Sequence, residues 1–300
     1  MRQRWRDILD PRGLFGGRFG GFSWRGDLFG GVTTAVISLP LALAFGVASG
    51  AGPQAGLVGA VCVGLFAALF GGTRTLISEP TGPMTVVMTA VIATLIAADP
   101  DDGLAMAFAV VVVAGLTQVG FGVLRLGRYV TLMPYSVISG FMSGIGVLLI
   151  LMQLGPLTGQ DAPGGGAWGV VRSLPDLIAG VRPAEAALAA VALVVLFGMP
   201  KSWRRWCPPH LVALGFGTLL SLMVFGEADL RRIGAIPMGL PELRWPTFSG
   251  GQLTLILIEG MVLGLLGCID SLLTAMIADS LTRQRHDSDR ELIGQGIGNT

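Results

Sequence analysis

Long apolar runs separated by short polar connectors dominate the chain. Most runs approach the roughly 20 residues that a helix needs to cross the hydrocarbon core of a bilayer, which is about 30 Å thick. The pattern therefore predicts an all-α polytopic membrane protein with about eight membrane segments. The predicted segments cover residues 28–50, 55–71, 81–98, 104–124, 133–155, 184–200, 209–226 and 252–279.

The polar ends of the chain complete the expected domain organisation. Residues 1–27 are predicted to form a cytoplasmic N-terminal segment, 28–282 the transmembrane domain, and 283–300 a cytoplasmic loop and the start of a ninth segment. That ninth segment stops after the few residues "ELIGQGIGNT". We therefore expect the chain to be part of a longer protein and to be inactive alone.

Composition and charge support the membrane class. Hydrophobic residues make up 52% of the chain and charged residues 13%, about half the charged share of a soluble domain. The net charge of +1 gives no reason to expect nucleic acid as a partner. No Ser/His/Asp arrangement, metal cluster or phosphate-binding loop stands out, and His210 and His286 lack a partner pattern for metal binding or catalysis. We therefore predict neither enzyme activity nor a cofactor.

Basic residues are distributed unevenly over the predicted connectors. With the N-terminus in the cytoplasm, fifteen of the twenty Lys and Arg residues fall on the cytoplasmic side. An excess of basic residues in cytoplasmic loops is the usual orientation signal of membrane proteins. The sequence thus predicts a multi-pass protein of the plasma (inner) membrane with a cytoplasmic N-terminus and with membrane lipid around it.

The third segment begins in an unusual way, at "TLISEPTGPMTVV". Arg74 is expected at the cytoplasmic surface, and Pro80 and Pro83 prevent a helix from starting before Thr81. Seven residues of extended chain span roughly 20 Å, which places Thr81 near the middle of the bilayer. A helix end at that depth presents free N–H groups and a positive dipole to an anion. The candidate anion-binding residues are Thr81, Gly82 and Met84.

A second interpretation of the same stretch is an ordinary Pro-kinked helix that fills space between its neighbours. Pro and Gly are common in membrane helices, so this stretch alone leaves both interpretations open. The nearby Glu79 is expected to pair with Arg74 and to have a structural role.

The last long segment contains an ionisable residue in its interior, Asp270. A carboxylate at mid-bilayer costs about 2.5–3.5 kcal/mol on insertion scales, and such residues usually face a cavity, a partner or an ion pathway. Thr274 lies one helical turn further on and shares the same face. The two oxygen-bearing side chains suit a small cation. A structural pairing of Asp270 with a neighbouring helix is the alternative.

Several stretches resemble the SulP (sulfate permease) anion transporter family, and within it the sodium-dependent bicarbonate transporters. These stretches are "RGDLFGGVTTAVISLPLALAFGVASGAGPQAGL", "GGTRTLISEPTGPMTVVMTAVIA", "RYVTLMPYSVISGFMSGIG" and "LGCIDSLLTAMIADSLTRQRHDSDRELIGQG". The resemblance implies fourteen segments in two inverted repeats of seven, of which this chain would hold the first repeat and the start of the second. It also implies a half-helix at the third segment and core and gate subdomains.

The resemblance also assigns roles to residues. Asp270, Thr274 and Thr81 correspond to the family's sodium site. Leu41 follows the first-segment proline where many sulfate-type members have Gln, and Glu79 stands where many have Gly; both departures favour the bicarbonate branch.

We therefore expect a secondary active transporter that couples bicarbonate uptake to sodium as the co-transported ion. A sulfate-like anion in place of bicarbonate remains open, as do a proton-coupled sulfate or dicarboxylate transporter and a passive anion channel of the same fold. A homodimer is one option for the oligomeric state.

Overall fold

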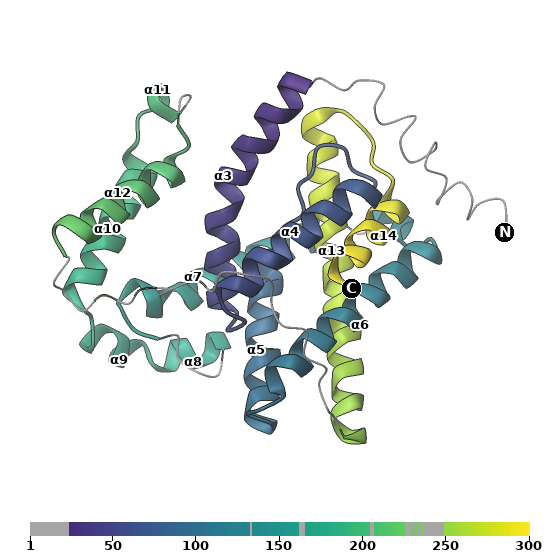
Figure 1. Cartoon of the computed structure of the whole chain (residues 1–300), viewed down its shortest axis with the longest axis horizontal. Helices are drawn as coiled ribbons and strands as arrows, with labels where there is room; N and C mark the ends of the chain where they lie inside the picture. Colours follow the sequence, from purple (N-terminus) through teal and green to yellow (C-terminus); the bar gives the residue numbers. More distant parts are fainter. Residues whose placement is uncertain are drawn as a thin grey trace. The chain divides into compact units, whose positions relative to one another are not determined.

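The computed structural model describes residues 24–132, 134–161, 166–204, 207–225 and 249–300, with single positions 230, 232 and 236. Every regular element in this described part is a helix, as predicted (Figure 1). The elements are α3 (Trp24–Ala48), α4 (Pro53–Phe70), α5 (Gly82–Ala98), α6 (Gly103–Val123), η1 (Gly127–Leu132), α7 (Tyr135–Leu157), α8 (Gly166–Arg172), α9 (Leu174–Ala179), α10 (Pro183–Gly198), α11 (Lys201–Arg204), α12 (Pro209–Met223), α13 (Gly250–Thr282) and α14 (Ser288–Asn299).

The eight predicted segments correspond to eight of these helices, namely α3, α4, α5, α6, α7, α10, α12 and α13. The 33-residue α13 is longer than its apolar run because Ser249 and Gln252 form a capping box at its start. The residues expected to open a ninth segment lie in the helix α14, which begins at Ser288, where the Asp287 side chain accepts the Arg290 N–H. Most of the predicted N-terminal cytoplasmic segment lies outside the described residues.

Five of the helices are long and apolar enough to cross a membrane: α3, α4, α6, α13 and residues Ser139–Leu157 of α7. α5, α10 and α12 are shorter apolar helices. Large apolar side chains on α10 face outward, including Val194 and Phe197, which are 71% and 81% exposed. Such surfaces are stable in contact with lipid, in keeping with an integral multi-pass membrane protein.

The chain divides into two compact units. One consists of Met1–Ser139 and Pro237–Thr300, and the other of Gly140–Ile236. In the second unit α10 packs against α12. All of the candidate site residues belong to the first unit.

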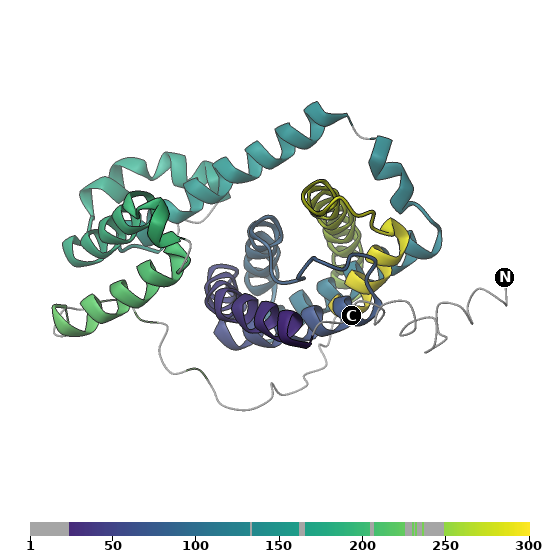
Figure 2. The same ribbon diagram turned by 90° about the horizontal axis from the view of Figure 1, so that it is seen from above.

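The core of the first unit is formed by α5, α6 and α13. Their buried apolar side chains make one cluster, whose members are Val91, Ile92, Leu95, Met106, Ala107, Val110, Ala114, Ile256 and Leu263. α14 packs against both α6 and α4 at one end of this core. Figure 2 views α5 and α13 close to end-on, with the yellow α14 beside α13.

Glycine permits the close approach of α13 to α6. A Cβ atom at Gly264 would lie 2.7 Å from Thr117 Cβ and 2.8 Å from the Ala114 carbonyl oxygen. Both distances are shorter than carbon atoms tolerate without movement of the backbone. Small residues at such crossings are how membrane helices reach close packing.

We expect Gly264→Ala to destabilise the complete protein by about 1–3 kcal/mol, because the added methyl overpacks the contact with Thr117. Gly120→Ala on α6 is the matched control, since a Cβ at Gly120 meets nothing within 4 Å. Thermal unfolding in detergent, followed by circular dichroism, measures both changes. Equal midpoints for the two variants would contradict this packing.

Candidate functional site

The candidate site begins where α5 begins. Residues 71–81 contain no helix, and Thr81 is the N-cap of α5 with extended backbone angles (φ −108°, ψ 153°). Pro83 lies in the first turn, where a missing N–H costs nothing, and the Thr81 carbonyl accepts the Thr85 N–H at 2.9 Å. The predicted break before the third segment is therefore present, and the alternative of a continuous kinked helix is wrong.

Asp270 meets this helix end from the middle of α13. Its residue surface is only 7% exposed, and its Oδ2 accepts a hydrogen bond from the Thr81 hydroxyl at 3.0 Å. The two residues are 189 positions apart in the sequence. The structure thus brings together the two features that the sequence singled out independently.

The side chain of Thr81 is committed to Asp270 and makes no cap hydrogen bond at its own helix. The first N–H groups of an α-helix have no partner within the helix. The start of α5 consequently keeps its unsatisfied donors and its positive dipole end close to the carboxylate. An anion and a cation are both attracted to such a place, each by a different group.

The other predicted site residues lie around this contact. The Thr274 hydroxyl donates to the backbone carbonyl of Asp270 at 2.9 Å. Thr274 therefore lies on the predicted face of α13, but this bond does not involve the Asp270 carboxylate. Gly82 is buried at the first position of α5. Met84 packs its side chain on the apolar core. Any role of Met84 toward an anion therefore falls to its backbone N–H.

The Oε2 atom of Glu79 is buried and has no hydrogen-bond partner. The expected pairing of Glu79 with Arg74 stays a prediction. Glu79 lies two positions before Thr81 and adds a second carboxylate to the neighbourhood of the helix start.

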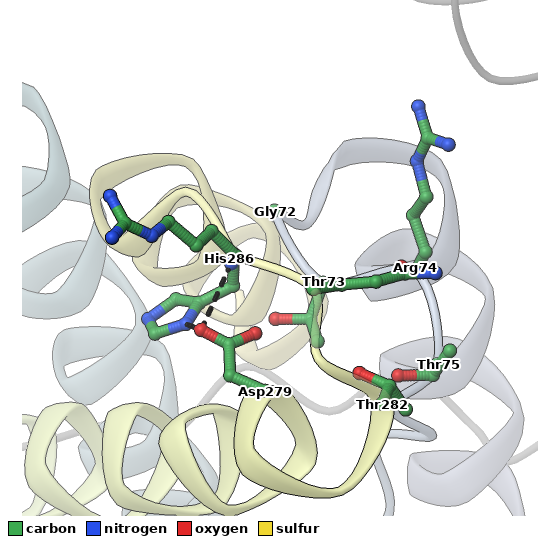
Figure 3. A pocket seen from close by; sticks show the side chains of 9 residues that line it. Gly72, Thr73, Arg74, Thr75, Asp279, Thr282 and His286 are labelled. Carbon is green, nitrogen blue, oxygen red and sulfur yellow. Dashed lines mark hydrogen bonds and ion pairs between the residues drawn. The ribbon is translucent and has the colours of Figure 1, made fainter.

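A pocket of about 340 Å³ lies between the chain that follows α4 and the loop that follows α13 (Figure 3). It is lined by Gly72, Thr73, Arg74, Thr75, Asp279, Thr282, Gln284, Arg285 and His286. In Figure 3 the His286 ring lies against the Asp279 carboxylate, with Nδ1 2.7 Å from Oδ2.

His286 therefore has side-chain partners that the sequence did not predict, although none of these contacts assigns it to a metal site or to catalysis. Its Nε2 lies 2.9 Å from the Ser288 hydroxyl, which completes a chain of Asp279, His286 and Ser288. The sequence hides this arrangement because the loop has to fold back on α13 first. The backbone N–H of His286 also donates to Asp279 Oδ2 at 3.2 Å. Two bonds to one carboxylate oxygen close the loop onto the helix end, which is a structural role.

Comparison with known proteins identifies the family. The family model described as "Sulfate permease family" matches residues 24–300. The chain belongs to this family. Membership confirms the resemblance seen in the sequence and places the chain in a family of transporters.

Two relatives illustrate the range of similarity. The chain is 62% identical over 275 residues to "Bicarbonate transporter BicA" of Synechocystis sp., covering 92% of this chain and 49% of the relative. It is 32% identical over 298 residues to "Putative sulfate transporter YvdB" of Bacillus subtilis, covering 95% of this chain and 54% of that one. The chain thus spans about half the length of the curated relatives it matches.

Solved structures agree on the fold. The transmembrane domain of a cyanobacterial bicarbonate transporter BicA matches with a TM-score of 0.85 and 62% identity, over 92% of this chain and 71% of that one. Murine Slc26a9, an anion transporter in its inward-facing state, matches with a TM-score of 0.78 at 17% identity, over 98% of this chain and 52% of that one. The second match extends the shared fold to a distant sequence.

We expect Thr81→Val to lower the free energy of unfolding by about 1–3 kcal/mol, because it removes the donor to a buried carboxylate without changing the size of the side chain. Thr81→Ser restores the donor and most of the stability. Thr94→Val is the control on the same helix, since the exposed Thr94 hydroxyl bonds only to its own helix at Ala90. Chemical or thermal unfolding of the complete protein measures the three variants, and a neutral Thr81→Val would contradict the contact.

Proposed function

We propose that the complete protein is a secondary active transporter that moves bicarbonate into the cell together with sodium. The observation that carries this proposal is the contact between the Thr81 hydroxyl at the start of α5 and the buried Asp270 carboxylate of α13. The 62% identity to a protein named as a bicarbonate transporter supports bicarbonate as the anion.

Sodium is the proposed ligand of the acidic half of the site. Asp270 supplies a carboxylate that bonds to the Thr81 hydroxyl, and Thr274 supplies a second hydroxyl, which bonds to the Asp270 backbone carbonyl. Hard oxygen ligands suit a hard cation. A bound cation also compensates a carboxylate that is otherwise costly to bury at this depth.

The anion is proposed to bind at the start of α5. Thr81, Gly82 and Met84 offer backbone N–H groups there, and the dipole of the 17-residue helix favours negative charge at this end. Bicarbonate is small and planar and has oxygen acceptors for these donors. A sulfate-like anion would use the same groups, so the anion itself rests on the similarity to the bicarbonate relative.

Coupling follows from the charges. Two unit charges 4 Å apart repel by about 4 kcal/mol at an effective dielectric constant of 20. Sodium beside Asp270 removes most of the repulsion that the carboxylate exerts on the anion. Sodium must therefore raise the affinity for the anion, and the anion must raise the affinity for sodium by the same factor.

The remaining parts of the proposal concern the whole protein. We place the N-terminus in the cytoplasm and the protein in the plasma membrane, on the basis of the fifteen basic residues on one side. Alternating access would come from movement of one subdomain against another around the fixed site. A homodimer is one candidate for the oligomeric state of the complete protein.

We expect Asp270→Asn in the complete protein to reduce sodium-driven bicarbonate uptake at least about 100-fold, because the amide carries no charge to hold the cation. Uptake of labelled bicarbonate into proteoliposomes, with and without an inward sodium gradient, measures the effect. Glu259→Gln removes one negative charge from the same helix and should keep uptake within about twofold of the unsubstituted protein.

Sodium-driven bicarbonate uptake that is undiminished in Asp270→Asn would contradict the proposed sodium site. Uptake driven by a proton gradient in place of sodium would favour the proton-coupled sulfate or dicarboxylate alternative, for which the similarity to a putative sulfate transporter is the supporting observation. Conductance without dependence on either gradient would favour a passive channel.

A further inference from the structure

The carboxylate of Glu291 is buried and bonds to the chain that follows α4. It belongs to the first turn of α14, its residue is only 2% exposed, and its charge has no role in the transport scheme above. Its Oε2 accepts the backbone N–H groups of Gly72 and Thr73, each at 2.8 Å. Glu291 is therefore bound to the extended chain that leads to Thr81.

Gln295, one helical turn further along α14, binds the same stretch of chain. Its Nε2 donates to Glu291 Oε1 at 2.9 Å and also to the hydroxyl of Ser78. Gln295 and Ser78 are both buried. The two side chains of α14 thus bind the extended chain at two places, residues 72–73 and residue 78.

One backbone and one side-chain hydrogen bond strengthen the same junction. The Gly72 carbonyl accepts the Asp287 N–H at 3.3 Å, and the Phe70 carbonyl accepts the Arg290 Nε–H at 3.3 Å. A Cβ at Gly294 would lie 2.3 Å from the Gly71 nitrogen, so α14 lies directly against this chain.

The extended chain depends on such bonds because it has no helix or strand to satisfy its backbone. Non-helical backbone at membrane depth is tolerated only where protein or water supplies the missing hydrogen bonds. Hydrogen bonds to a charged acceptor are about twice as strong as those between neutral groups. Glu291 provides two of them from one oxygen.

The residues bound by α14 are close in sequence to Thr81, which belongs to the proposed ion site. Thr81 follows Ser78 by three residues, which span at most about 10 Å. Bonds at 72–73 and at 78 therefore limit how far Thr81 can move from Asp270.

We propose that Glu291, together with Gln295, is a positioning residue of the sodium and bicarbonate site. It acts through residues 72–78 and sets the distance between Thr81 and Asp270, without touching either ion. The transport readout of this proposal rests on the proposed function, whereas its structural readout does not.

Two substitutions of Glu291 distinguish the role of its acceptor oxygen from the role of its charge. Both N–H groups bond to the same oxygen, so the amide oxygen of Glu291→Gln can still accept both. The Gln295 amide can rotate by half a turn to face the new NH₂ group. Glu291→Ala removes the acceptor altogether and leaves the two part-buried N–H groups without this partner.

Asp289 provides a matched control on the same turn of α14. Its Oδ1 accepts the Gly127 N–H at 3.1 Å, a bond to the chain after α6 and not to residues 72–78. Asp289→Ala therefore also deletes a carboxylate that binds a backbone N–H. Asp289→Ala frees the backbone N–H of Gly127, whereas Glu291→Ala frees those of Gly72 and Thr73.

The first measurement is the sodium dependence of bicarbonate uptake by the complete protein in proteoliposomes. We expect Glu291→Ala to raise the KM for sodium about tenfold or more, because the binding-competent arrangement becomes a minor population. Glu291→Gln should stay within about threefold of the unsubstituted protein, and Asp289→Ala likewise. An equal rise in KM for Glu291→Ala and Asp289→Ala would overturn the proposal, because Glu291 would then only hold α14 in place.

The second measurement is amide hydrogen exchange of residues 70–81 in the same samples, with and without sodium. Glu291→Ala should exchange faster there than either other variant. If the unsubstituted protein shows no sodium-dependent uptake, the proposed function fails and hydrogen exchange alone decides this inference. Unchanged exchange of residues 70–81 in Glu291→Ala would overturn it in either case.

Discussion

The contact on which the site depends is the hydrogen bond from Thr81 to Asp270. A carboxylate buried among apolar helices requires a compensating partner, and a helix that starts inside the molecule requires something to face its unsatisfied N–H groups. Each of the two features would be costly alone. Together they form a polar, buried place at which the proposed sodium and anion sites adjoin.

Holding these two groups together requires close packing elsewhere. Glycine at position 264 lets α13 approach α6, and α6 in turn packs against α5 through the apolar core. α14 then binds the extended chain in front of α5 through Glu291 and Gln295. The first unit is therefore built so that a stretch of irregular backbone can exist inside a membrane protein.

The similarity in fold to a distantly related anion transporter fits this view. The two sequences share only 17% identity, yet the TM-score is 0.78. Membrane helices that pack through small residues and shape can keep their arrangement while most side chains change. The identity of the anion depends on far fewer residues, which is why the fold is a poorer guide to it than the site.

The sequence determined the helices, because runs of about 20 apolar residues and the prolines around Thr81 act locally. It also revealed Asp270, since a charge in an apolar run is conspicuous. Only the tertiary structure decided which partners meet. In the sequence, Glu291 and Gln295 resemble the polar start of a helix, and His286 lies in a charged loop. Their contacts with Gly72, Ser78 and Asp279 form only when separate segments of the chain pack together. Local patterns encode secondary structure and burial, whereas hydrogen bonds between segments depend on how those segments pack in three dimensions.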